Sequence, residues 1–147
     1  MGKYDRVSHR VGEPKIGEEA ALAEFQKILK FYEVGIDDAT NADAKKTLED
    51  TFDELVMAFR WGELELEDGE QGFKIIQHLS NGQSITYREL KAADAKVLER
   101  FDRQKEAQAA SFAILGRLSG IGDDAIRVLK GQDKTNAVGL SILFFMA

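Results

Sequence analysis

The feature that most constrains the fold of this chain is a short segment with strand-like alternation, residues 63–86, between two longer segments with helical periodicity. Glu63–Glu67 alternates polar and apolar residues, as a half-buried strand does, and Phe73–Leu79 predicts a second strand. Asp68-Gly69 and Asn81-Gly82 are dipeptides typical of tight hairpin turns. The segment therefore predicts an antiparallel meander of two or three strands within an α+β protein that is mainly helical.

The residues before the meander predict an extended arm and then an acidic helical hairpin over residues 17–61. Residues 1–16 have no periodicity and contain the only proline, Pro14. Residues 17–34 carry apolar side chains at the three- and four-residue spacing of an amphipathic helix. Gly35 is expected to end this helix in the left-handed conformation.

The second helix of the hairpin is expected to begin at a polar connection and to run to about Arg60. Thr40 and Asn41 are both candidates for its N-cap. Asp37, Asn41 and Asp43 have some of the spacing of a calcium-binding loop, but the loop lacks the required glycine. A helix connection explains these residues better than a metal site does.

Helical segments are expected from the end of the meander to the end of the sequence. Thr86 and Glu89 match a capping box, which predicts a helix that begins at Tyr87. Its apolar stripe comprises Leu90, Ala93, Val97, Leu98 and Phe101. A further stripe comprises Phe112, Leu115 and Leu118. Residues 62–147 are therefore expected to form a β-meander plus a helical lobe, in one compact domain with residues 17–61.

Glycine and aspartate residues predict the boundaries of the last helices. Gly120-Ile121-Gly122 is expected to break the preceding helix. Asp123 is expected to cap a short helix that Gly131 ends, and Asp133 to cap the last helix. That helix ends in a run that is apolar on nearly every side, so another part of a protein must cover it.

Charge is distributed unevenly along the chain. The net charge is −6 and the isoelectric point is near 5.0, which argues against a general nucleic-acid-binding protein. Residues 18–70 hold 16 acidic and 5 basic residues, whereas the remainder holds 10 acidic and 15 basic residues. This asymmetry has two interpretations: a solvated helical face, or an acidic surface that attracts the basic surface of a second copy.

The residues that usually carry enzyme chemistry are scarce. The chain has no cysteine, which removes disulfides, thiolate nucleophiles and cysteine-ligated metals. No glycine-rich phosphate-binding motif is present. His9 lies in the arm, His78 is expected to face outward from a strand, and Ser80 and Ser84 are expected to have no histidine nearby. We therefore predict no catalytic, cofactor-binding or metal-binding residues and no enzymatic activity.

The hydropathy of the chain favours a cytoplasmic protein. The amino terminus has no apolar core of the kind that signal peptides carry. The longest apolar stretch, residues 137–147, is about half the length of a membrane-spanning helix.

The order of the elements in residues 61–145 is more distinctive than any single motif. A meander leads into a helix with Arg88-Glu89-Leu90 and Asp94, then come the Leu115–Ile121 turn and Asp133. This order resembles the small tail assembly chaperones of long-tailed bacteriophages and prophages, especially the Mu-like branch. The acidic hairpin before residue 61 is not part of the pattern.

The resemblance implies a protein that binds the tape-measure protein and keeps it soluble before the tail tube polymerises around it. It also implies possible contact with the tail tube protein, no cofactor or nucleotide, and absence from the mature virion. Two other classes stay open. One is a structural adaptor, such as a head–tail connector or a tail completion protein, and the other is a small acidic regulatory or inhibitor protein.

The last helix offers the clearest candidate surface for a partner. An apolar helix can be the central helix of a core, or it can present a face to a partner such as a long tape-measure helix. On the second interpretation, the partner-binding residues are Leu140, Leu143, Phe144 and Phe145.

Overall fold

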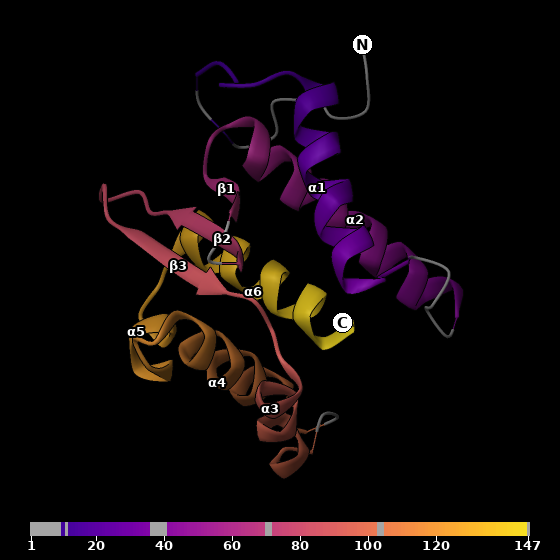
Figure 1. Ribbon diagram of the computed structural model, residues 1–147, viewed down its shortest axis with the longest axis vertical. Helices are drawn as coiled ribbons and strands as arrows, with labels where there is room; N and C mark the ends of the chain where they lie inside the picture. Colours follow the sequence, from indigo (N-terminus) through magenta and orange to yellow (C-terminus); the bar gives the residue numbers. More distant parts are fainter. Residues whose placement is uncertain (1–9, 11, 36–40, 70–71, 103–104, 147) are drawn as a thin grey trace.

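The structure, a computed structural model, describes residues 10, 12–35, 41–69, 72–102 and 105–146. Its helices and one three-stranded sheet form the mainly helical α+β fold expected from the sequence (Figure 1). In chain order the elements are α1 (Glu18–Tyr32), α2 (Ala42–Arg60), β1 (Leu64–Gly69), β2 (Gly72–His78), β3 (Ser84–Arg88), α3 (Ala92–Ala95), η3 (Lys96–Arg100), α4 (Ala107–Ser119), α5 (Asp123–Arg127) and α6 (Gly131–Met146).

The sheet is the predicted antiparallel meander, with the strand order β1-β2-β3. The β2–β3 connection contains Asn81 and Gly82, and Gly82 has the positive φ of +89° that this tight turn requires. The first turn was predicted two residues too early. Asp68 and Gly69 pair with β2 as strand residues, and the connection at residues 70–71 lies outside the described residues.

The capping box predicted at Thr86 and Glu89 is wrong. β3 continues to Arg88, with Tyr87 paired to Ile75 of β2, and α3 begins only at Ala92. Tyr87 is 1% exposed, so the strand conformation buries a large aromatic ring. A helix that started at Tyr87 would move this ring out of its buried position. The long-range pairing outweighs the local capping signal.

The segment after β3 is helical for less of its length than its apolar stripe suggested. α3 is a single turn, and Lys96–Arg100 continues as a 3₁₀ helix. Of the predicted stripe, Leu98 is buried, whereas Ala93 is exposed. The chain therefore crosses from the sheet to α4 through two short turns.

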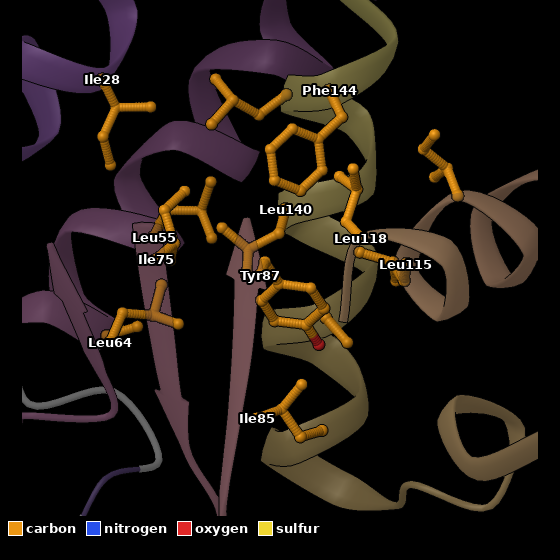
Figure 2. Packing of buried hydrophobic residues seen from close by; sticks show 14 of the residues in the cluster. Ile28, Leu55, Leu64, Ile75, Ile85, Tyr87, Leu115, Leu118, Leu140 and Phe144 are labelled. Carbon is orange, nitrogen blue, oxygen red and sulfur yellow. The ribbon is translucent and has the colours of Figure 1, made fainter. Parts of the chain in front are cut away.

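α6 is the central helix of the core (Figure 1). It packs against α2 on one side and against α4 on the other. Figure 2 shows Leu140 and Phe144 of α6 among side chains from the sheet, from α4 and from the helical hairpin. The ring centroid of Phe144 lies 6.5 Å from that of Tyr87 and 6.0 Å from that of Tyr32. One apolar helix thus joins three parts of the protein.

The predicted helical hairpin is present, and α1 packs along α2. Phe25 of α1 meets Phe52 of α2 edge to face, with centroids 5.2 Å apart. Asn41 caps α2, because its side-chain oxygen accepts a hydrogen bond from the Ala44 N–H at 2.8 Å. Glu33, with φ of 55°, takes the left-handed position expected of Gly35. Thr40 and Asp37 lie outside the described residues.

The boundaries of the last two helices differ from the prediction. Gly120, with φ of +75°, ends α4 as expected. Gly122 takes the N-cap position of α5, so Asp123 is its first helical residue and not its cap. Gly131, with φ of +58°, begins α6 and does not end α5. Asp133 therefore lies inside the first turn of α6.

The contact between α4 and α5 depends on a residue without a side chain. The Gly122 N–H donates to the carbonyl of Gly116 at 3.3 Å, which folds α5 back onto α4. A Cβ atom on Gly116 would overlap the backbone N of Asp123 and lie 2.5 Å from the carbonyl carbon of Gly122. Because these are backbone atoms, they cannot rotate away.

Substitution of Gly116 with alanine is expected to lower the free energy of unfolding by about 3 kcal/mol, because overpacking against backbone forces α5 away from α4. Urea denaturation monitored by circular dichroism measures the change. Gly69→Ala is the matched control, since a Cβ there would meet no atom within 4 Å. Equal stability of the two variants would show that α5 does not pack as described.

Candidate functional site

The partner surface predicted on α6 is not available, because three of its four residues belong to the core. Leu140, Leu143 and Phe144 are 1%, 0% and 2% exposed, and Phe145 is partly buried against the same cluster. The interpretation of α6 as a partner-binding face is therefore wrong for these three side chains. The alternative interpretation, a central core helix, is the one that the structure has.

Asp94 holds together β3, α3 and α4. Its carboxylate is 2% exposed and accepts hydrogen bonds from Arg88 Nη1 and Nη2, both at 2.7 Å, and from Arg117 Nε at 2.6 Å. The Lys91 N–H donates to it at 2.9 Å. The bonds from Arg88, first, and those from Arg117 and Lys91 lower the pKa of Asp94, although burial acts in the opposite direction. With its charge fully paired, Asp94 is a structural group.

A glutamate, a histidine and a serine meet on the outer face of the sheet, contrary to the expectation for Ser84. His78 Nδ1 lies 3.0 Å from Ser84 Oγ, and His78 Nε2 lies 2.8 Å from Glu65 Oε1. The three types match a nucleophile, a base and an orienting acid. However, Glu65 and Ser84 are exposed, whereas an acyl-transfer site excludes water from its reacting groups. These contacts link three neighbouring strands. His9 lies outside the described residues.

A buried amide connects the inner face of the sheet to α6. Gln77 is fully buried; its side-chain oxygen accepts from the Tyr87 hydroxyl and its Nε2 donates to the Asp133 carbonyl, each at 2.8 Å. Burial raises the pKa of Tyr87, which therefore stays protonated and serves as a donor. The Asp133 carboxylate accepts from the N–H of Ser80 at 3.1 Å and from its hydroxyl at 2.8 Å. Asp133 thus fastens the β2–β3 turn to α6.

Two classes of site lack support in the described residues. Within this part of the chain, no group of three or more histidine, aspartate or glutamate side chains is arranged to hold a metal ion. None of the described helices is both long enough and apolar enough to cross a membrane.

An open groove lies between the β2–β3 turn and α5. Its volume is about 790 Å³. Its apolar lining residues are Leu79, Ile85, Ile121, Ala125, Val128 and Leu129. Its full lining comprises Leu79, Ser80, Asn81, Gln83, Ser84, Ile85, Ile121, Ala125, Val128, Leu129, Lys130 and Asp133. We call this surface the α5 groove.

Two large apolar side chains in the lining of the α5 groove are exposed. Ile121 is 49% exposed, and Val128, at 70%, is the most exposed large apolar side chain in the part of the chain described. Neither residue is held by the core, so burial on folding does not account for them. Polar side chains of the β2–β3 turn line the opposite edge. Exposed apolar side chains next to polar ones in an open groove fit a protein-binding surface.

Charged side chains of both signs lie on the α5 side of the groove: Asp123 and Asp124 as well as Arg127 and Lys130. Arg127 and Lys130 are exposed, and Arg127 has a long ion pair with Asp123, at 3.4 Å. The Asp133 carboxylate in the lining is engaged by Ser80. Lys130 is the basic residue in the lining, so an acidic residue beside the apolar stripe of a partner is complementary to it.

No family model, curated protein or solved structure matches this chain.

The site analysis from sequence missed Ile121 and Val128. The sequence predicted Ile121 only as part of a helix-breaking turn, and Val128 lies within the short helix predicted between Asp123 and Gly131. No signal in the sequence indicated this exposure, because α5 is shorter than predicted: it ends at Arg127, so Ile126 is buried and Val128, two positions later, is exposed.

Proposed function

We propose that this protein is a phage tail assembly chaperone that binds an amphipathic helix of the tape-measure protein in the α5 groove. The observation that carries the proposal is the exposure of Ile121 and Val128 in the lining of the α5 groove. Such a surface binds an amphipathic helix by covering its apolar stripe. A long tape-measure helix needs this cover, because uncovered apolar stripes aggregate.

The residues that carry the family resemblance support the proposal in a second way. Arg88 and Asp94 form an ion pair, and the Gly116 carbonyl accepts a hydrogen bond from the N–H of Gly122, which precedes α5. The Asp133 carboxylate binds Ser80 in the β2–β3 turn. The contacts of Gly116 and Asp133 position α5 and the turn, which are the two sides of the α5 groove. These two residues of the pattern therefore help to build this surface, whereas Arg88 and Asp94 hold β3, α3 and α4 together.

The charge of the proposed partner follows from Lys130, the basic residue in the lining of the α5 groove. A helix with apolar residues at three- and four-residue spacing and an acidic residue beside them would place its carboxylate against this side chain. Exposed pairs of this kind add little affinity and act mainly on the association rate, so binding should be slower at high salt.

Substitution of Val128 with aspartate is expected to abolish co-purification with a co-expressed tape-measure protein, because it places a charge in the apolar contact. The fold should be unaffected, since Val128 is 70% exposed. Ala23→Asp, on the exposed face of α1, adds the same charge elsewhere and should leave co-purification intact.

Two results would contradict the proposal. One is a folded Val128→Asp variant that still co-purifies with the tape-measure protein, which would place any contact elsewhere. The other is failure of the wild-type protein to bind or to increase the soluble yield of the tape-measure protein.

A further inference from the structure

The outer side of β1 carries backbone groups that have no partner among the described residues. The His78 N–H donates to the Glu63 carbonyl, and these two residues continue the β1–β2 register, so the odd-numbered residues of β1 form its hydrogen-bonded pairs with β2. The N–H and C=O groups of Leu66 and Asp68 therefore point away from β2. Within the part of the chain described, they make no hydrogen bond. We call the segment Glu65–Gly69 the β1 edge.

Other parts of the border of the sheet are covered. Arg10 Nε donates to Glu63 Oε2 at 3.0 Å and Leu64 is 1% exposed, so the start of β1 is closed. β3, the opposite edge strand, packs against α4 (Figure 1). Leu66 is partly exposed and Asp68 is exposed, so an added strand can reach the backbone of the β1 edge.

Apolar side chains flank the β1 edge on the side of α1. A groove of about 420 Å³ lies between β1 and the start of α1, and its apolar lining residues are Ile16, Ala20, Phe59, Leu64 and Leu66. At the other end of the edge, Phe31 stacks on Phe73, the cross-strand neighbour of Asp68, with ring centroids 4.4 Å apart. Ile16 and Phe31 are 36% and 47% exposed, and outside the α5 groove they are the exposed large apolar side chains of the described residues.

The other side of the β1 edge is acidic. Glu65 and Glu67 are exposed and alternate with the inward-facing leucines of β1, so they point to the outer face of the sheet. Glu67 has one basic neighbour, Lys74 of β2, and an added strand would place a side chain on its other side. β1 of a second copy would bring its own glutamates against these, whereas basic side chains would be attracted. Lys15 and Glu24, in the groove, have opposite charges.

We propose that the β1 edge is a docking site for an extended segment of a partner protein in which basic and apolar residues alternate. The segment adds a fourth strand to the three-stranded sheet through the backbone groups of Leu66 and Asp68. Because successive side chains of a strand point to opposite faces, its apolar residues lie on the side of Ile16 and Phe31 and its basic residues face the glutamates. This site is independent of the α5 groove, and its tests do not use the tape-measure protein.

A short fluorescent peptide in which lysine and valine alternate, blocked at both ends, is the probe for this site. A peptide of the same composition with its lysines grouped at one end is the control. Fluorescence anisotropy should show saturable binding of the alternating peptide and an affinity about tenfold lower for the grouped peptide, because only alternation matches both sides of the edge. Hydrogen exchange followed by NMR should slow at the N–H groups of Leu66 and Asp68 in the complex.

Asp68→Pro should weaken binding of the alternating peptide by about tenfold or more, because proline removes an outward N–H and its ring occupies the edge. Pairing of β1 with β2 should persist, since the N–H of Asp68 takes no part in it. Asp68→Ala is the matched control: it removes the same charge but keeps the N–H, so it should bind more tightly than Asp68→Pro.

A second pair of variants tests the groove without a change in the strand. Ala20→Lys should weaken binding, because it places a positive charge in the groove lining, and Gln26→Lys, at an exposed position of α1 outside the lining, should not. Equal binding by Asp68→Pro and Asp68→Ala, or by Ala20→Lys and Gln26→Lys, would overturn the proposal. So would equal affinity of the wild-type protein for the two peptides, or unchanged exchange at Leu66 and Asp68 at saturation.

Discussion

Replacing Asp94 with alanine is expected to lower the free energy of unfolding by about 3 kcal/mol, at the upper end of what hydrogen bonds to a charged group contribute. The carboxylate is buried and accepts bonds from Arg88, Arg117 and the Lys91 N–H, so its loss releases β3, α3 and α4 from one another. The arginine side chains are each 43% exposed and can be solvated again, which keeps the loss below that of a fully buried ion pair.

The same residue makes a prediction about acid stability. The pKa of Asp94 is lowered in the folded state, first by its bond from Arg88, so the unfolded chain binds a proton more readily than the folded chain does. Its contribution to stability is therefore complete above about pH 5 and is lost as the pH falls below the unfolded value of about 4 toward the lower folded value. Asp94→Asn should flatten the decline in stability between about pH 5 and pH 3.

Chemical denaturation of Asp94→Ala, Asp94→Asn and wild type across this pH range tests both statements. Asp124→Asn is the matched control, because Asp124 is exposed in α5 and its loss should change stability by less than about 0.5 kcal/mol. A parallel decline in wild type and Asp94→Asn would mean that other carboxylates account for the acid sensitivity.

Phe144→Ala is expected to lower the free energy of unfolding by about 3–5 kcal/mol, the range for deletion of a buried aromatic ring. Phe144 is 2% exposed and lies between Tyr32 of α1 and Tyr87 of β3, so the cavity would open where α6 joins the hairpin to the sheet. Because small proteins are stable by only about 5–15 kcal/mol, the variant should lose much of its stability.

The comparison with Val128→Ala separates a core residue from a binding residue. Val128 is exposed, so its truncation should change the melting temperature little and should weaken partner binding. Phe144→Ala should do the reverse: a lower melting temperature and, in the folded fraction, intact binding. Differential scanning calorimetry together with a pull-down experiment gives both quantities. If Phe144→Ala were as stable as wild type, α6 would not be the central helix of the core.

The sequence predicted correctly those elements that depend on residues close together along the chain. The Asn81-Gly82 turn, the amphipathic periodicity of α1 and α2 and the N-cap at Asn41 depend on residues close in sequence. The end of β3 does not. Thr86 and Glu89 form a good local capping pattern, but pairing of Tyr87 with Ile75 extends the strand past it.

The contacts around the candidate sites vary in how far the sequence could reveal them. The meeting of Ser84 with His78 was only partly within reach: a hairpin at Asn81-Gly82 brings them onto neighbouring strands, but a two-residue turn would place His78 opposite Ile85, whereas the observed connection places it opposite Ser84. Arg10 was not, since one arginine in a segment without periodicity does not indicate a buried position next to Glu63. The α5 groove is built by segments that Asp133 and Gly116 bring together, so it exists only once the chain has folded.

Site-specific photo-cross-linking tests the central claim, that the α5 groove binds a tape-measure helix, most directly. A benzophenone amino acid at position 128 should cross-link to the co-expressed tape-measure protein, and mass spectrometry should locate the products on residues spaced three or four apart in one apolar stripe. The same amino acid at position 23, on the exposed face of α1, should give no such product. Cross-links from position 23 and none from position 128 would contradict the account.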